Sequence, residues 1–184
     1  MALRECHYFS VAADEIFCGG KSNGYMSIEL IKRDLVLTRL IKAPREKVYR
    51  AWTDAEMLKQ WFAPLPYTTP EAELDVRPGG SQRIVMRSPE GGDSPMLGVY
   101  LEVLPNERLV FTDAYSAAWE PTEKAFMTVV LTFEDEEGGT RYTALVRHWT
   151  AADCEAQEKM GFHAGWGAAT DQLEQLLAGQ GGVD

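Results

Sequence analysis

Cysteine is scarce in this sequence and is not arranged in pairs. The 184 residues contain three cysteines, Cys6, Cys18 and Cys154, and no two of them form a C-x-x-C pair. An odd count without paired spacing argues against a disulfide framework. Because structural disulfides belong to oxidising compartments, this usage favours a reducing setting such as the cytoplasm.

Long hydrophobic runs and an excess of positive charge are also missing. No stretch approaches the ~18 consecutive apolar residues of a membrane span. The first residues lack the basic-then-apolar order of a signal peptide. The chain has 18 Lys and Arg against 28 Asp and Glu, a net charge of −10. This balance disfavours a general affinity for nucleic acid or anionic membranes. We therefore expect a cytoplasmic protein that binds neither nucleic acid nor membrane.

The usual metal and catalytic motifs are absent as well. Beyond residue 30 the histidines are His148 and His163, with no H-x-x-x-H, no cysteine cluster and no G-x-S-x-G. The acidic run at residues 134–137 lacks the spaced ligands of a calcium loop. The sequence therefore predicts no metal site and no cofactor.

What the chain does have is apolar material for one domain. It is 45% hydrophobic and includes five tryptophans, enough for a single core at this length. Residues 1–30 show no regular period and are predicted to be a poorly ordered extension. Translation from Met26 is an open alternative. Residues 31–179 are predicted to form the domain, and residues 180–184 a tail.

Within the predicted domain, the period of the apolar residues changes along the chain. Residues 35–41 alternate like a strand, and two short helical patterns follow at residues 44–52 and 54–62. Further strand-like runs are separated by turn residues, and one amphipathic helix is predicted over residues 151–178. These later runs are 72–77, 81–87, 96–104, 108–115, 126–133 and 140–149. The order is one strand, two short helices, five or six further strands and one long helix, and it predicts an α+β fold in which a curved antiparallel sheet grips the long C-terminal helix.

An ordered set of short motifs resembles one known family. The string LTRLIKAPREKVYRAWTDAEMLKQWFAP resembles the opening of the activator-of-Hsp-90-ATPase-homologue family, within the START-like, helix-grip (SRPBCC) superfamily. The same superfamily holds birch-pollen allergens and polyketide cyclases. The resemblance covers about residues 34–178 and excludes residues 1–30. It continues through DVRPGG (75–80), GVYLEV (98–103), PNERLVFT (105–112), GTR (139–141), Gly165-Trp166 and Leu173.

The resemblance implies a helix-grip fold, in which a curved antiparallel sheet of about seven strands wraps around the C-terminal helix. It also implies an elongated cavity between the sheet and this helix, which members of the superfamily use for apolar molecules. Aromatic side chains would line it, although each of them could equally fill the core. Arg83, Arg147 and His148 would add polar groups if strand register turns them inward, since a shift of one residue turns them out. The aromatic candidates are Trp61, Phe62, Phe111, Trp119, Phe126 and Trp166.

His163 is the leading candidate acid–base group, with His148 or Tyr100 as alternatives for a second role in proton transfer. It shares a helical stripe with Met160, Trp166 and Leu173 and is therefore expected to face the sheet. There it is either a hydrogen-bonded core imidazole or a polar group that orients a ligand or transfers a proton.

Three functions follow as hypotheses. The first is binding of an apolar or amphipathic small molecule, without catalysis, by a protein that could form a homodimer. The second is a cofactor-independent enzyme of the cyclase or hydrolase type that uses His163. The third, regulation of a chaperone ATPase, is suggested by the family name, although the namesake relatives carry a further domain that is absent here.

Overall fold

The computed structural model describes residues 33–179, so the predicted extension over residues 1–30, the start at Met26 and the tail lie outside the described residues. Seven antiparallel strands form one sheet in the order β1-β7-β6-β5-β4-β3-β2. The strands are β1 (Asp34–Ile41), β2 (Thr68–Leu74), β3 (Ser81–Arg87), β4 (Asp93–Leu104), β5 (Arg108–Thr112), β6 (Met127–Glu136) and β7 (Gly139–His148).

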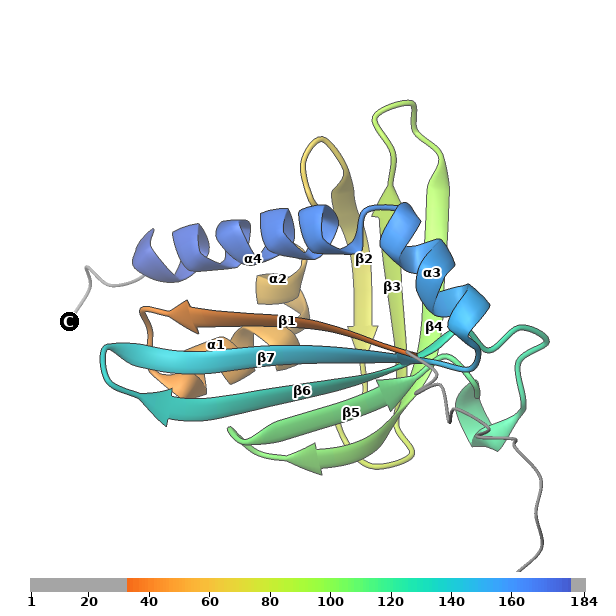
Figure 1. The fold of residues 1–184 in the computed structure, drawn as a ribbon, viewed down its shortest axis with the longest axis horizontal. Coiled ribbons are helices and arrows are strands. Elements are labelled where there is room, and N and C mark those ends of the chain that lie inside the picture. Colours follow the sequence, from red (N-terminus) through yellow and green to blue (C-terminus); the bar gives the residue numbers. More distant parts are fainter. Residues whose placement is uncertain (1–32, 180–184) are drawn as a thin grey trace, which may run out of the picture. The chain divides into compact units, whose positions relative to one another are not determined.

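Helices follow the first and the last strand. α1 (Arg45–Thr53) and α2 (Ala55–Leu58) come after β1, α3 (Ala151–Lys159) and α4 (Phe162–Gly179) come after β7, and a 3-10 helix (Ala117–Trp119) lies between β5 and β6. α4 runs across the face of the sheet, as Figure 1 shows. The core combines buried side chains of the sheet with those of α1, α2 and both C-terminal helices. This arrangement confirms the predicted α+β fold.

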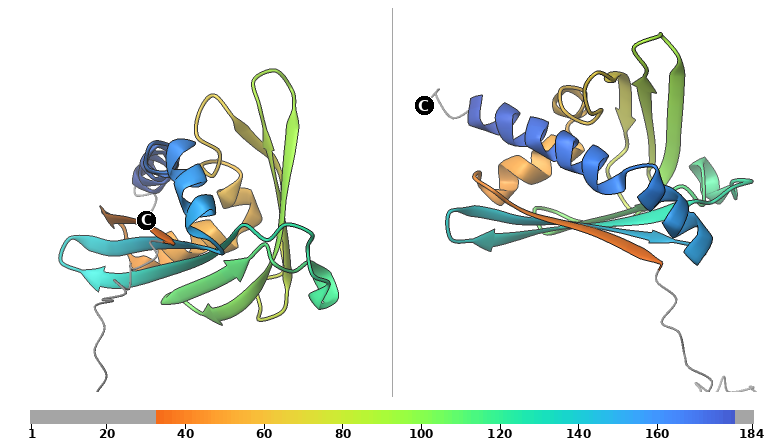
Figure 2. Two further views of the ribbon diagram at one scale, coloured as in Figure 1. Left: turned by 45° about the vertical axis from the view of Figure 1, so that its right-hand side comes forward. Right: turned by 45° about the horizontal axis from the view of Figure 1, so that its top comes forward.

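The sheet bends within β4, and the bend makes room for the cavity. The pairing of β4 with β5 shifts between Tyr100 and Glu102, which marks a bulge at the intervening residue. At Gly98 a Cβ would lie 2.6 Å from the carbonyl oxygen of Thr112, so the two backbones approach more closely than any side chain allows. Figure 2 shows β2, β3 and β4 turned away from the plane of β1, β7 and β6. The concave face between these two parts lies towards α4.

The edge strand β2 begins earlier than predicted. Its pairing with β3 runs from Thr68 to Leu74, with a register shift between Thr68 and Glu71. The sequence pattern predicts this strand at residues 72–77, whereas the observed strand includes Pro70 and ends at Leu74. An edge strand tolerates a proline, since the missing N–H can fall on the unpaired side or at a bulge.

The C-terminal segment is two helices rather than the single one predicted over residues 151–178. Gly161 has φ of +94°, and it separates α3 from α4. Glycine adopts this conformation without steric strain, as at many helix ends. The break changes which residues face the sheet: Phe162 is buried, while Met160 is 72% exposed and His163 is also exposed.

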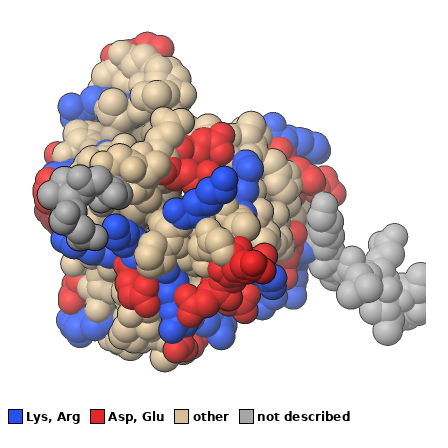
Figure 3. Space-filling model, turned by 90° about the vertical axis from the view of Figure 1, so that its left-hand side faces the viewer, with Lys and Arg blue, Asp and Glu red and all other residues tan. Residues whose placement is uncertain are grey.

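Charged side chains of both signs are interspersed on the face seen in Figure 3. Several ion pairs connect different elements of the fold. Arg39 lies 3.7 Å from Asp171 on α4, and Arg45 lies 3.2 Å from Asp135 on β6. The net negative charge therefore does not gather into an acidic patch on this face.

Asp54 separates α1 from α2 and caps the second helix. Its carboxylate accepts hydrogen bonds from the backbone N–H groups of Glu56 at 3.0 Å and Met57 at 3.1 Å. These bonds, the one from Met57 first, hold the pKa of Asp54 below its usual value.

Replacement of this cap should weaken the domain in a pH-dependent way. We expect Asp54→Ala to lower the free energy of unfolding by about 1 kcal/mol at neutral pH. Because the pKa of the folded state is lowered, the charged cap stabilises the protein above the unfolded pKa and loses this effect as the pH falls through the folded pKa. Urea unfolding at several pH values checks this. A difference between wild type and variant that stays constant into acid would contradict it.

Candidate functional site

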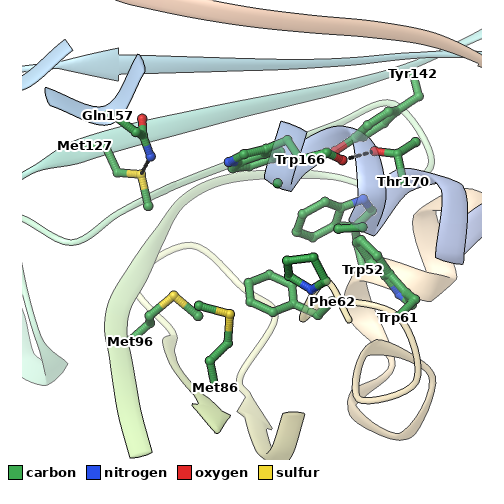
Figure 4. Close-up of a pocket in the computed structure, with 13 residues that line it drawn as sticks. Trp52, Trp61, Phe62, Met86, Met96, Met127, Tyr142, Gln157, Trp166 and Thr170 are labelled. Atoms are coloured by element: carbon green, nitrogen blue, oxygen red, sulfur yellow. Dashed lines mark hydrogen bonds between the residues drawn. The ribbon is translucent and has the colours of Figure 1, made fainter. Parts of the chain in front are cut away.

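A cavity of about 240 Å³ lies between the sheet and the C-terminal helices. Residues from α1, the region after α2, strands β3, β4, β6 and β7, and both α3 and α4 form its wall (Figure 4). We call it the first cavity. It is lined by Trp52, Trp61, Phe62, Pro64, Met86, Met96, Met127, Tyr142, Gln157, Gly165, Trp166, Ala169 and Thr170.

Trp52 is the centre of the aromatic side of this wall. Its ring lies 4.8 Å from that of Trp61, edge to face, and 6.3 Å from that of Trp166, stacked. Tyr142 and Phe62 complete the cluster at 6.2 and 6.1 Å. The Nε1–H of Trp61 donates to the carbonyl oxygen of Ala51 at 3.1 Å, which fixes the orientation of that indole. Mutually packed rings of this kind form a rigid apolar surface.

Methionines form the other side of the cavity. Met86, Met96 and Met127 come from three different strands and are all half-buried. Figure 4 shows Met86 and Met96 across from Phe62 and Trp61. Because methionine is unbranched and polarizable, it adapts to irregular apolar ligands and favours contact with aromatic rings. The cavity thus has one rigid wall and one adaptable wall.

Few polar groups interrupt this lining. Thr170 uses its hydroxyl to donate to the carbonyl oxygen of Trp166 at 2.7 Å. Burial raises the pKa of Tyr142 well above its usual value, and the neighbouring Trp52 indole offsets part of that rise. The phenol is therefore neutral at every physiological pH. Gln157 places its amide on the wall from α3.

A second cavity of about 340 Å³ adjoins the first. The two share Phe62, Met96, Met127 and Trp166 as lining residues. The second cavity is more polar, because its wall also includes charged and amide side chains. Its remaining lining residues are Gln82, Ile84, Pro95, Leu97, Phe111, Asp113, Thr122, Lys124 and Val129.

The loop after α2 is held beside the first cavity by one side chain of α4. Gln172 accepts a hydrogen bond from the N–H of Leu65 and donates to the carbonyl oxygens of Trp61 and Ala63, each at 2.9 Å. Pro64, in the middle of this loop, lines the cavity. The amide of Gln172 therefore fixes the position of this part of the wall.

Four of the residues predicted to bind a ligand lie on these walls. Trp61, Phe62 and Trp166 line the first cavity. Phe111 joins Phe62 and Trp166 on the second. Their elements are far apart in the sequence, and the bent sheet brings them together.

Arg83, Trp119 and Phe126 line neither cavity. Arg83 forms an ion pair with Glu71 of β2, and its neighbours Gln82 and Ile84 are the residues of β3 that reach the second cavity. Strand alternation therefore places Arg83 on the opposite face, which corrects the prediction that it turns inward. Trp119 is 54% exposed and lies against Gly79. Phe126 packs its ring edge-on against His148 at 5.3 Å.

Neither His148 nor His163 lines the first or the second cavity. His163 is exposed, so the prediction that it faces the sheet is wrong. After the break at Gly161, the buried stripe of α4 runs through Phe162, Ala169 and Leu173, and His163 lies beside this stripe. His148 is buried and points inward, where both of its ring nitrogens are hydrogen-bonded.

Sequence reasoning missed the methionines, Tyr142, Gln157 and the role of Trp52 on the wall. A usable signal existed in the alternation of β6 and β7. Met127 shares a strand face with Val129 and Leu131, and Tyr142 shares one with Ala144 and Val146. For Gln157 no periodic signal was available, because α3 has almost no apolar face.

Two negative findings hold for the part of the chain that the structure describes. Within residues 33–179 no cluster of three or more His, Cys, Asp or Glu side chains could hold a metal ion. Nor does that part contain a helix of the length and hydropathy needed to cross a membrane.

Comparison with known proteins assigns this chain to a family. Residues 42–178 match the family model described as "Activator of Hsp90 ATPase homolog 1-like protein". The chain belongs to this family. The match covers every element from the end of β1 to the last turn of α4, and so includes all residues of both cavities.

Three solved structures are similar to this chain in sequence and in fold. A crystal structure of a Nitrosomonas europaea protein is 40% identical, with a TM-score of 0.78, and the match covers 80% of this chain and 96% of that one. A Staphylococcus epidermidis protein solved by NMR is 26% identical, with a TM-score of 0.70 and coverage of 86% and 98%. A Chromobacterium violaceum protein is 25% identical, with a TM-score of 0.65 and coverage of 78% and 96%. No curated protein matches the chain. Folds of this kind commonly bind ligands.

Proposed function

We propose that this protein binds an apolar or amphipathic small molecule in the first cavity. The observation that carries the proposal is the wall itself, where Gln157 and Thr170 are the polar members and the rest are aromatic, methionine, proline or small residues. Apolar cavities with a few placed polar groups are typical of small-molecule sites.

The second cavity supports an amphipathic ligand rather than a purely apolar one. Its wall adds Lys124, Asp113 and Gln82 to the shared residues, so charged and apolar surfaces lie next to each other. A ligand with its ring system in the first cavity would extend a polar group past Met96 and Met127 into the second. Together the two spaces reach the size of ordinary ligand pockets, ~300 Å³ or more.

Catalysis by His163 has no support, because this side chain is exposed and lies outside both cavities. Chaperone regulation, which the family description mentions, stays a prediction that a pulldown would test. Homodimer formation and a cytoplasmic location also remain predictions. Native mass spectrometry of freshly purified protein would report the mass of a bound ligand and the number of subunits together. Protein that carries no ligand, and whose tryptophan fluorescence is unchanged by a library of apolar compounds, would contradict the proposed function.

Gly165 offers a way to fill the first cavity without disturbing the fold. It lines the cavity on α4, and a Cβ placed there meets no atom within 4 Å. We expect Gly165→Leu to weaken ligand affinity by about tenfold or more, which corresponds to ~1.4 kcal/mol. Stability should stay the same or rise by up to about 1 kcal/mol, since glycine is a poor helix former.

Ala164→Leu is the matched control, because Ala164 is the exposed neighbour on the same helix. It adds a side chain of the same type outside the cavity and should leave the affinity unchanged. Titration of tryptophan fluorescence with the ligand found by mass spectrometry gives both affinities. Equal affinity of Gly165→Leu and wild type would place the binding site elsewhere.

A further inference from the structure

His148 and Gln157 form a hydrogen-bonded pair behind the wall of the first cavity. His148, 2% exposed, places Nδ1 3.1 Å from the carbonyl oxygen of Arg33 and Nε2 2.6 Å from Oε1 of Gln157. The other end of the Gln157 amide, Nε2, lies 3.7 Å from Sδ of Met127. Gln157 and Met127 both line the cavity, across from Trp52 and Trp61 in Figure 4.

The two partners of His148 constrain where its protons lie. A backbone carbonyl oxygen can only accept, so the contact with Arg33 requires a proton on Nδ1. In the neutral ring Nε2 is then an acceptor. The amide oxygen of Gln157 is also an acceptor, so this oxygen can face Nε2 only when the ring is a doubly protonated imidazolium.

The neutral ring requires the opposite orientation of the amide. If the Gln157 side-chain amide turns over, its NH₂ group donates to Nε2 of His148 and its oxygen takes the place beside Met127. The two orientations differ by an exchange of oxygen and nitrogen of nearly equal size, so the packing is the same in both. What changes is the atom that Gln157 presents to the cavity.

Met127 cannot compensate for that exchange. A thioether sulfur is a weak acceptor and never a donor. It can therefore accept weakly from the NH₂ group, but it leaves the oxygen without a donor. A ligand that supplies the missing partner gains a hydrogen bond that solvent does not provide inside the cavity.

We infer that Gln157 determines which ligands the cavity prefers, and that His148 positions its amide according to the protonation state of the imidazole. When the imidazole is neutral, the Gln157 oxygen faces the cavity and favours a ligand with a hydrogen-bond donor, such as an aromatic N–H or O–H group. When the imidazole is protonated, the NH₂ group faces the cavity and favours a ligand with an acceptor, such as an aryl ketone. This inference rests on the proposed function and names the ligand chemistry of the same site.

Charged groups surround this pair on several elements. Asp34 is the carboxylate that interacts electrostatically with His148. The hydrogen bond between Asp34 and Arg147 is the main cause of the lowered pKa of Asp34, and the nearby imidazole of His148 lowers it further. The ionised carboxylate in turn attracts the imidazolium. The titratable and charged residues nearest to His148 in the segments packed around it are Arg33, Asp34 and Arg147 at this end of β1 and β7, Asp113 beside Met127, and Asp153, Cys154, Glu155, Glu158 and Lys159 on α3.

Three neutral aromatic probes separate the two states. Indole has a donor and no acceptor on its ring nitrogen, 2-acetonaphthone has an acceptor and no donor, and naphthalene has neither. Dissociation constants are measured by tryptophan fluorescence and calorimetry from about pH 5 to about pH 8.5, the range in which histidine titrates. The affinity ratio of indole to 2-acetonaphthone should rise at least about fivefold with pH, because each net hydrogen bond is worth a few-fold in affinity. Naphthalene affinity should stay constant.

Two variants test the assignment to these residues. Gln157→Met keeps the size of the side chain and removes the amide, so the affinity ratio should become independent of pH while naphthalene still binds. His163→Gln removes the exposed histidine and should leave the pH dependence intact. The ¹⁵N chemical shifts of His148 in the free protein give a readout that needs no ligand. They should show a protonated Nδ1 at every pH and a protonated Nε2 in acid alone.

The outcomes distinguish this inference from the proposed function. If none of the three probes binds, the proposed function is wrong and the inference falls with it. If naphthalene binds but the affinity ratio of indole to 2-acetonaphthone does not change with pH, the inference alone is wrong. The same holds if the neutral imidazole of His148 carries its proton on Nε2. A pH dependence that persists in Gln157→Met also overturns it.

Discussion

Trp52→Ala should destabilise the protein more than any other side-chain truncation on the cavity wall, by about 3 to 5 kcal/mol. Trp52 is buried and its ring contacts those of five other aromatic residues, so truncation removes apolar burial and leaves a large void. Those partners are Trp61, Phe62, Phe111, Tyr142 and Trp166. The measurement is the free energy of unfolding from urea titration, followed by circular dichroism.

The polar atom of Trp52 sharpens this prediction. Its Nε1–H is buried and makes no hydrogen bond of ordinary distance and angle, although the indole lies close enough to the Tyr142 phenol to offset part of the rise in its pKa. Packing is therefore the main contribution of this side chain. Trp52→Phe keeps an aromatic ring and removes the indole N–H. It should therefore cost much less, about 1 to 2 kcal/mol.

Trp149→Ala is the control for loss of a tryptophan as such. Trp149 is 54% exposed, and truncation there should change stability by no more than about 0.5 kcal/mol. If Trp52→Ala and Trp149→Ala were equally stable, the aromatic cluster would not be the centre of the core.

Local patterns predicted the α+β class and most of the elements, because most strands and helices have one buried face and one exposed face. In β6, for example, Val129, Leu131 and Phe133 are buried and alternate with partly exposed neighbours. The second of the two short helices carries its own cap residue in Asp54. The break at Gly161 was missed because Met160, His163 and Trp166 keep a helical spacing of three across it. Periodicity alone could not show that the backbone turns left-handed there.

The candidate site was predicted less completely than the fold. Its composition depends on which face of a strand each side chain lies on and on the bend of the sheet. Trp61, Phe62 and Trp166 are large enough to reach the cavity from the helical side, and composition pointed to them. For Arg83 a register difference of one residue decides between cavity and opposite face. Gln157 matters through its contact with His148 across two elements, and a single sequence carries no signal of such a contact.

The second large effect concerns the tight turn between β6 and β7, where two glycines follow each other. Gly139→Ala should destabilise the protein by about 3 kcal/mol or more, since strain and backbone displacement add there. Gly139 has φ of +155°, and a Cβ would lie 2.1 Å from the carbonyl oxygen of Ile41. The following residue, Thr140, pairs with Ile41 and donates a buried hydrogen bond of 2.6 Å to the carbonyl oxygen of Ala43.

Gly138 supplies the matched control, because it shares the positive φ but not the crowding. Its φ is +91°, and a Cβ there meets no atom within 4 Å. Gly138→Ala should therefore cost the conformational strain alone, about 1 to 2 kcal/mol. Urea unfolding of both variants separates the two contributions, and hydrogen exchange of β1 and β7 should increase in Gly139→Ala but not in Gly138→Ala. Equal stability of the two variants would mean that the β6–β7 turn can move away from Ile41 without loss. In that case the close approach of β1 would not hold this end of the sheet, and the strand that leads into α1 would be free to shift with the wall of the cavity.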